Sequence, residues 1–151
     1  MAEDRKRNFR FNNIIIHGQE DIDDAEQDNV FFDKFVKELC IGSVQAKTIT
    51  RIGKKCDGKK RPIKVTLPNS EIKEKIMSNL KNLRDIGYNH ISITDDYTVT
   101  ERKIIKDFVE KAKEANNKES TESEYVWVVR GNPKNGLFLK RLIKKNRPIN
   151  Q

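Results

Sequence analysis

Residues 47–67 read KTITRIGKKCDGKKRPIKVTL, two runs of β-branched residues separated by a loop rich in lysine and glycine. In the second run Ile63, Val65 and Leu67 alternate with polar residues, which predicts a strand with one buried and one polar face. The first run, over 47–52, is expected to point Ile49 inward. Residues 53–61 then form the loop of a β-hairpin, and this loop carries five bases.

Comparable patterns flank the hairpin on both sides. Residues 13–18, which read NIIIHG, predict a buried strand that ends at glycine. A helix capped by Asp28 is expected next, and its apolar stripe comprises Phe32, Phe35, Val36, Leu39 and Cys40. After the hairpin, residues 68–70 punctuate the chain, and a second helix follows with a stripe of Ile72, Ile76, Leu80 and Leu83. Residues 90–94 alternate again and predict a fourth strand.

The resulting order is β-α-β-β-α-β. This order predicts an α+β fold of the ferredoxin-like type, with a four-stranded antiparallel sheet and both helices on one face. The first domain is expected to span residues 8–96, after a basic N-terminal segment at 1–7. The other face of the sheet is left bare and forms a platform.

The pattern changes beyond residue 96. Thr98 and Glu101 have the spacing of a capping box, and the helix that follows has an apolar stripe of Ile104, Ile105, Phe108, Val109 and Ala112. Residues 116–124 are polar and are expected to be mobile. Two short strands, 125–129 and 137–139, are expected to flank a turn at 131–136. We therefore expect a helix–hairpin domain at 97–145, too small to be stable alone and docked on the first domain, and a basic tail at 146–151.

Positive charge is concentrated in two blocks. The 151 residues carry a formal net charge of +8, but residues 47–64 carry +7 and residues 131–151 carry +6, whereas residues 11–46 carry −6. Neutralising a phosphate backbone releases counterions, and the gain scales with the number of bases that act together. This distribution favours nucleic acid as the partner, and a solvated loop and tail that serve solubility are the alternative.

Several protein classes are excluded. The apolar runs are too short to cross a bilayer, and no secretion signal precedes the first strand. Two cysteines, Cys40 and Cys56, cannot form a disulfide framework, which favours a reducing compartment.

Four segments carry a family resemblance: residues 12–18, 52–55, 60–67 and 125–128. In series they resemble the first-open-reading-frame protein of LINE-type, non-LTR retrotransposons, and most closely its invertebrate versions. The resemblance implies an RNA-recognition-motif-like domain followed by a small C-terminal domain. It also implies a chaperone without cofactors that coats single-stranded RNA, and also DNA, in cytoplasmic ribonucleoprotein particles, with the nucleus as the alternative location. Relatives form homo-oligomers through an N-terminal coiled coil, and we expect no such coil within residues 1–151.

The resemblance points to particular basic residues. The loop between strands two and three binds phosphate in relatives and here holds Lys54, Lys55, Lys59, Lys60 and Arg61. Further matches are Arg84 near the end of the second helix and Arg102 or Lys103 at the start of the third. The charge pattern adds Arg51, Lys64, Arg130, Lys140 and Arg141. Most loop positions are lysine, which binds phosphate as a point charge without the bidentate geometry of arginine.

The platform lacks the aromatic residues on which such domains stack bases. Ile15 stands where one aromatic is expected, and the third strand offers Pro62 and Lys64. Electrostatics then supplies most of the affinity, which predicts weak sequence specificity and steep salt dependence. Tyr125, Trp127 and Phe138 are candidate stacking residues in the second domain, although Trp127 is expected in the core. Tyr88 and Tyr97 either reach a base or pack internally.

No enzymatic or metal site is expected. His17 and His90 have no ligand or catalytic partner at suitable spacing and are interpreted as structural. Cys56 has no identifiable base, and Asp95 with Asp96 is explained by helix entry. The acidic segment 20–28 is interpreted as a solvated surface that repels phosphate. The alternative hypothesis is that the chain is a degenerate RNA-recognition motif that binds proteins. A third hypothesis, a metal-dependent nuclease, is the least favoured.

Overall fold

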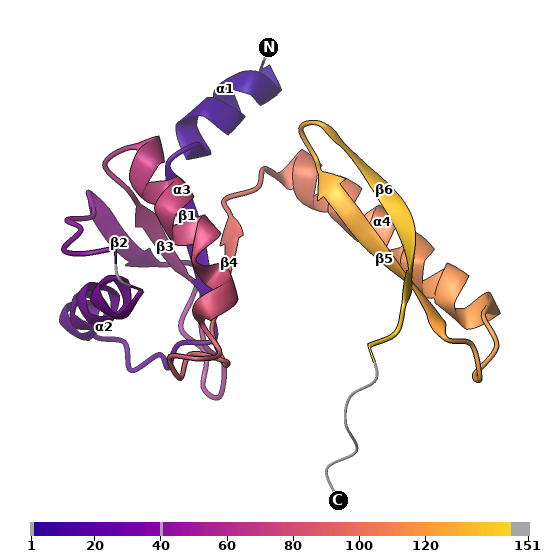
Figure 1. Cartoon of the computed structure of the whole chain (residues 1–151). Coiled ribbons are helices and arrows are strands. Elements are labelled where there is room, and N and C mark those ends of the chain that lie inside the picture. Colours follow the sequence, from indigo (N-terminus) through magenta and orange to yellow (C-terminus); the bar gives the residue numbers. More distant parts are fainter. Residues whose placement is uncertain (1, 40, 146–151) are drawn as a thin grey trace, which may run out of the picture. The chain divides into compact units, whose positions relative to one another are not determined.

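The computed structural model describes residues 2–39 and 41–145, and the chain divides into two compact units, Met1–Asp96 (unit 1) and Tyr97–Gln151 (unit 2). Both units combine helices with antiparallel strands, so the predicted α+β class is confirmed (Figure 1). The division falls after residue 96, where the sequence pattern changes. The expected core position of Cys40 and the tail at 146–151 lie outside the described residues.

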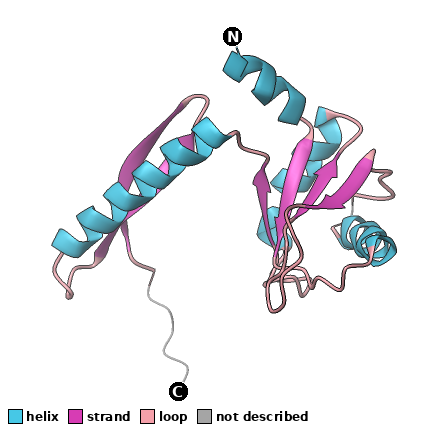
Figure 2. Ribbon diagram, turned by 180° about the vertical axis from the view of Figure 1, so that it is seen from behind, coloured by secondary structure: helices cyan, strands magenta, loops and turns pink. Residues whose placement is uncertain are grey.

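Unit 1 contains a four-stranded antiparallel sheet whose strand order is β2-β3-β1-β4 (Figure 2). Its elements in chain order are α1 (Ala2–Arg10), β1 (Asn13–His17), α2 (Ala25–Glu38), β2 (Thr48–Arg51), β3 (Ile63–Thr66), α3 (Ser70–Ser78), the 3-10 helix η1 (Leu80–Asn82) and β4 (Ser92–Asp95).

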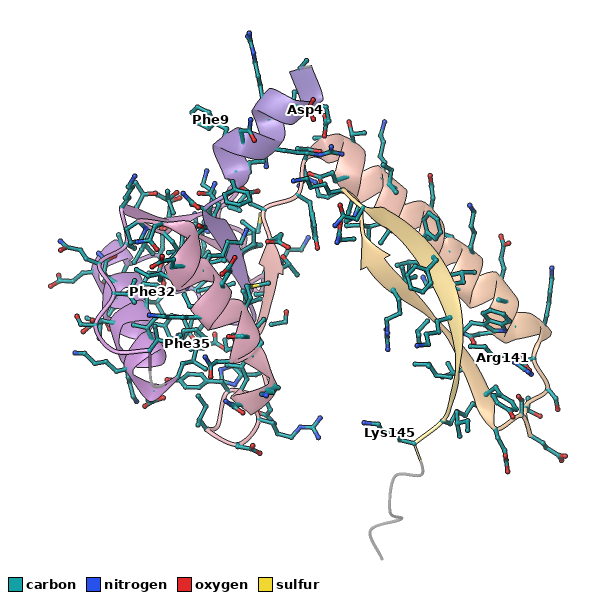
Figure 3. The ribbon with its side chains drawn as sticks, turned by 45° about the horizontal axis from the view of Figure 1, so that its top comes forward. Asp4, Phe9, Phe32, Phe35, Arg141 and Lys145 are labelled. Atoms are coloured by element: carbon teal, nitrogen blue, oxygen red, sulfur yellow. The ribbon has the colours of Figure 1, made fainter. Side chains whose placement is uncertain are left out.

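The core lies between α2, α3 and one face of this sheet. Ile14 and Ile63 on that face are fully buried with Phe32 and Phe35 of α2, both seen on α2 in Figure 3. The alternation of strand residues, which sends every second side chain to the same face, produces this core. It also places Ile15 on the opposite face, away from the helices.

Three helix predictions need correction. Asp24 rather than Asp28 caps α2, because the Asp24 carboxylate accepts the N–H groups of Glu26 and Gln27. Asp28 lies inside the helix and is buried. Helix α3 ends at Ser78, and α1 was not predicted at all.

Unit 2 consists of α4 (Val99–Lys118) and a hairpin of β5 (Tyr125–Asn132) and β6 (Gly136–Ile143). The predicted capping box is confirmed, since Thr98 and Glu101 each accept the backbone N–H of the other. Both strands are longer than predicted. Among residues 97–145, Ala112 is the only hydrophobic residue that is buried, so polar contacts contribute much of the order in this unit.

No helix in the described part of the chain is both long and apolar enough to cross a lipid bilayer.

Candidate nucleic-acid interface

The basic loop, residues 52–62 between β2 and β3, lies against the acidic loop, residues 19–24 between β1 and α2. Arg61 contacts Asp21 at 2.7 Å and Asp23 at 2.8 Å. The Nζ atom of Lys60 lies 2.7 Å from the Glu20 carboxylate, and Lys55 donates to the backbone carbonyl of Asp21. We call these contacts the clasp. Most of the acidic segment is exposed, as the interpretation of a solvated surface expects, but Asp21 departs from it: its side chain is 1% exposed and pairs with bases of the predicted phosphate site.

The electrostatics of the clasp favour its charged form. Hydrogen bonds from Arg61 hold the pKa of Asp21 well below its ordinary value, although burial of that carboxylate acts in the opposite direction. The same hydrogen bonds raise the pKa of Arg61. The hydrogen bond from Lys60 lowers the pKa of Glu20. These groups consequently stay ionised at neutral pH, and the acids offset the charge of the loop bases.

Because the clasp depends on ionised carboxylates, we expect the free energy of unfolding to fall in acid. Because the folded state depresses the Asp21 pKa below its ordinary value of 3.8, the stabilisation is complete above that value and is lost as pH falls towards the folded pKa. Urea unfolding midpoints measured from neutral to strongly acidic pH should decline less steeply for Asp21→Asn than for the natural chain. Equal slopes below the ordinary pKa would contradict the prediction.

Arg51 is a structural residue and not an available phosphate ligand. Its guanidinium binds both oxygens of Asp28, from Nε at 2.9 Å and from Nη2 at 2.6 Å. The remaining N–H groups reach the backbone carbonyls of Gln19, Glu20 and Arg61. An arginine has five N–H donors, and all five are used here. The prediction of Arg51 as a nucleic-acid contact is corrected on this ground.

Two lysines of the basic loop stay outside the clasp, and Lys60 within the clasp stays partly exposed. Lys54 and Lys59 are exposed and have no ion-pair partner among the described residues, and the Lys60 side chain keeps 46% of its surface exposed. Lys64 follows the loop on β3, opposite Ile15 of β1 and Thr50 of β2. These four lysines are the bases of unit 1 that remain accessible around the hairpin.

The face of the sheet opposite the helices, which we call the open face, is polar. It presents threonines of β2, β3 and β4 together with Asn13, Ile15 and His17 of β1. A hydrogen-bonded chain crosses it: Thr66 donates to Asn13, and Asn13 and Arg10 donate to Asp96. None of the four strands contains Phe, Tyr or Trp, and the one imidazole, of His17, lies 3.3 Å from the hydroxyl of Thr94, so the open face lacks the large rings on which such domains stack bases.

Tyr88 packs internally, which decides between its two predicted roles. Its ring lies 5.2 Å from that of Phe35 in an edge-to-face arrangement, and 6.3 Å from that of Phe31. Burial and a hydrogen bond with Glu38 raise the pKa of Tyr88 to about 12. This ring contributes to the core of unit 1 rather than to a base-stacking surface.

In unit 2 the end of α4 organises the hairpin. Glu119 accepts hydrogen bonds from Trp127 Nε1 at 3.1 Å and from Arg141 Nε at 2.8 Å, and Figure 3 shows Arg141 beside this end of α4. Arg141 also lies 4.1 Å from the centroid of the Tyr125 ring. Hydrogen bonds from Arg141, and then from Ser123 and Trp127, lower the pKa of Glu119. Trp127 and Arg141 are thus held in internal contacts.

Asn116 completes this organisation. Its side chain accepts the backbone N–H of Trp127 at 2.7 Å and donates to the Trp127 carbonyl at 2.9 Å. The segment 116–124, for which we expected a mobile polar stretch, instead includes the end of α4, which continues to Lys118. Beyond the helix, Ser123 donates a hydrogen bond to Glu119. Sequence reasoning missed Asn116 and Glu119, since a polar segment after a helix is typical of a linker.

Comparison of the sequence with models of known protein families and with curated proteins returned no match. The chemistry of the described side chains is therefore the basis for a function. Within residues 2–39 and 41–145, no group of three or more His, Cys, Asp or Glu side chains could hold a metal ion. Asp95 and Asp96, the carboxylate pair in the sequence, are separately engaged, Asp95 with Lys73 at 2.6 Å and Asp96 with Arg10 at 2.8 Å.

The predicted contact residues fall into two groups. Internal ion pairs engage Arg51, Lys55, Lys60, Arg61 and Arg141. The second group has no ion-pair partner among the described residues and comprises Lys54, Lys59, Lys64, Arg84, Arg102, Lys103, Arg130 and Lys140. That they line one cleft between the two units stays a prediction.

Proposed function

We propose that the protein binds single-stranded RNA, with single-stranded DNA as a second ligand, without catalysing a reaction. The observation that carries the proposal is the second group of bases, which no acid of the described chain neutralises. Lys54, Lys59 and Lys64 gather around the β2–β3 hairpin, and Arg130 and Lys140 lie on the β5–β6 hairpin. Unpaired bases that gather on each of the two hairpins favour a polyanion, because each phosphate they neutralise releases counterions.

The fold supports the finer prediction of an RNA-recognition-motif-like unit. The element order β-α-β-β-α-β and the strand order β2-β3-β1-β4 are those of the split βαβ arrangement. The proposal therefore includes the role that the sequence resemblance implies, a retrotransposon-type chaperone that packages RNA in ribonucleoprotein particles as a homo-oligomer.

Binding through unit 1 is electrostatic in this proposal. Lys64 is the one lysine or arginine that the four strands present on the open face, and the threonine hydroxyls around it bind phosphate or sugar without reading bases. Sequence specificity is consequently low, and affinity falls steeply as salt rises.

The test removes Lys54, Lys59 and Lys64, the unpaired lysines of the β2–β3 hairpin, together by substitution with alanine. Arg61 is kept because it holds Asp21 and Asp23, and its loss would disturb the loop itself. We expect weaker binding to every single-stranded RNA, and a salt slope of log affinity reduced by about 2, since each contact on a single strand contributes about 0.7. Fluorescence anisotropy of labelled RNA at several ionic strengths measures both quantities.

A matched control removes three lysines elsewhere, in Lys34→Ala, Lys37→Ala and Lys113→Ala. These lysines are exposed and form only ion pairs within their own helix, so the control loses the same net charge at different places. It should retain most of the slope. Equal losses in both triple variants would show a general charge effect and contradict the interface. A natural chain indifferent to RNA at low salt would instead favour the protein-interaction alternative.

A further inference from the structure

The two faces of the β5–β6 hairpin differ in their surroundings. Trp127 and Arg141 are cross-strand neighbours, and both bind Glu119, the C-cap residue of α4, so the face they share is turned towards the end of that helix. Side chains alternate between faces along each strand. The opposite face, which we call the outer hairpin face, therefore comprises Val126, Val128, Arg130, Phe138, Lys140 and Leu142.

Phe138 is the exposed aromatic residue of this face. Its side chain is 53% exposed, although aromatic residues usually bury most of their surface. Gly131 adjoins the Phe138 ring, and it has no side chain that could cover the ring. A Cβ atom at Gly131 would lie 2.3 Å from the carbonyl oxygen of Gly136, so this position admits only glycine. Tyr125 and Trp127, the other candidate rings, are engaged by Arg141 and Glu119.

Two cations flank the Phe138 ring. Arg130 lies directly opposite Phe138 in the register, and Lys140 follows two residues along β6 on the same face. Neither has an ion-pair partner in the described chain, and Arg130 donates only to the adjacent carbonyl of Val129. The whole segment 125–143 contains no acidic residue. A second copy of this face would meet like charge, whereas a polyanion with flat apolar groups fits both features.

We infer that Phe138 is a base-stacking site for single-stranded nucleic acid, with Arg130 and Lys140 on the neighbouring phosphates. This inference rests on the proposed function and adds the stacking contact that the strands of unit 1 lack. A base stacked on an exposed aromatic ring binds with little preference for sequence, because every base has a π-face.

The experiment compares two probes with the full chain. One is a labelled oligothymidine, and the other is an oligomer of the same length and charge that lacks all bases. The natural chain should bind oligothymidine more tightly, by roughly tenfold for one stacked base. Phe138→Ala should remove this difference without changing the affinity for the abasic oligomer, and Phe138→Tyr should restore it. Arg130→Ala and Lys140→Ala should weaken both probes to a similar extent.

Ile143→Ala is the matched control, because Ile143 is 69% exposed on the same hairpin but on the face that bears Arg141. It should leave the difference between probes unchanged. The emission of Trp127, the single tryptophan, reports whether each variant keeps the hairpin folded against α4. Phe138 variants with natural emission then test stacking rather than folding.

The outcomes separate the two claims. If the natural chain binds both probes equally, or if Phe138→Ala keeps the preference for oligothymidine, the stacking site is wrong while binding to phosphates stands. If the natural chain binds neither probe at low salt, the proposed function fails and the site fails with it. If Phe138→Ala converts a dimer to a monomer without changing the probe preference, the outer hairpin face is a self-association surface and the inference is overturned.

Discussion

Gly18→Ala is expected to destabilise unit 1 by roughly 2–4 kcal/mol, and it combines two separate costs. Gly18 follows β1 with a φ of +97°, a left-handed conformation that costs other residues about 1–2 kcal/mol. In addition, a Cβ atom at this position would lie 2.0 Å from the carbonyl oxygen of His90. That oxygen belongs to the backbone just before β4, so the clash is relieved only by moving the chain beside the sheet.

Gly53→Ala provides the control for this prediction. Gly53 has a similar φ of +89°, but no atom lies within 4 Å of the position its Cβ would take. Its substitution should therefore carry only the conformational cost of about 1–2 kcal/mol. Urea unfolding of both variants measures the difference, which is the contribution of the close approach between Gly18 and His90. Equal destabilisation of the two variants would contradict the clash.

The sequence predicts the elements of unit 1 well because their signals are local. Alternation at Ile63 and Val65 and the stripe containing Phe32 and Phe35 reflect which side chains face the core, and the structure confirms both. The approach of His90 to Gly18 joins segments far apart in the chain, so no local pattern contains it. The prediction of the residue that caps α2 was wrong for a related reason. Asp28 has a side chain suited to an N-cap, but its carboxylate pairs with Arg51, which lies on β2 and is distant in the sequence.

The candidate interface could be predicted less completely, because charge counts do not show which charges face each other. Lys55, Lys60 and Arg61 belong to a segment of strong positive charge, yet the clasp offsets all three. One signal was present, since the acidic block 11–46 adjoins the basic block 47–64 with almost equal and opposite charge. Such complementary neighbours indicate intramolecular pairing as readily as a ligand site.

Arg51→Ala is expected to lower the free energy of unfolding by about 3–5 kcal/mol. The Arg51 side chain is 6% exposed and the Asp28 side chain 10% exposed, so the substitution leaves a buried carboxylate without its partner. It also leaves the backbone carbonyls of Gln19, Glu20 and Arg61 without the donor that joins both loops to β2. Loss of this single residue should therefore loosen the clasp as well as the ion pair, and urea unfolding measures the combined effect.

Arg51→Lys and Lys54→Ala distinguish structure from ligand binding. Lysine keeps the charge but cannot reproduce five fixed donors, so Arg51→Lys should also lose stability. Lys54→Ala removes a base from the basic loop that follows Arg51 and should leave stability nearly unchanged while weakening RNA binding. If Arg51→Ala instead keeps the stability of the natural chain and weakens RNA binding, Arg51 is a phosphate ligand and the structural role is wrong. The two roles exclude each other here, because donors that already hold Asp28 and three carbonyls can reach a phosphate only after the acidic loop has left the basic loop.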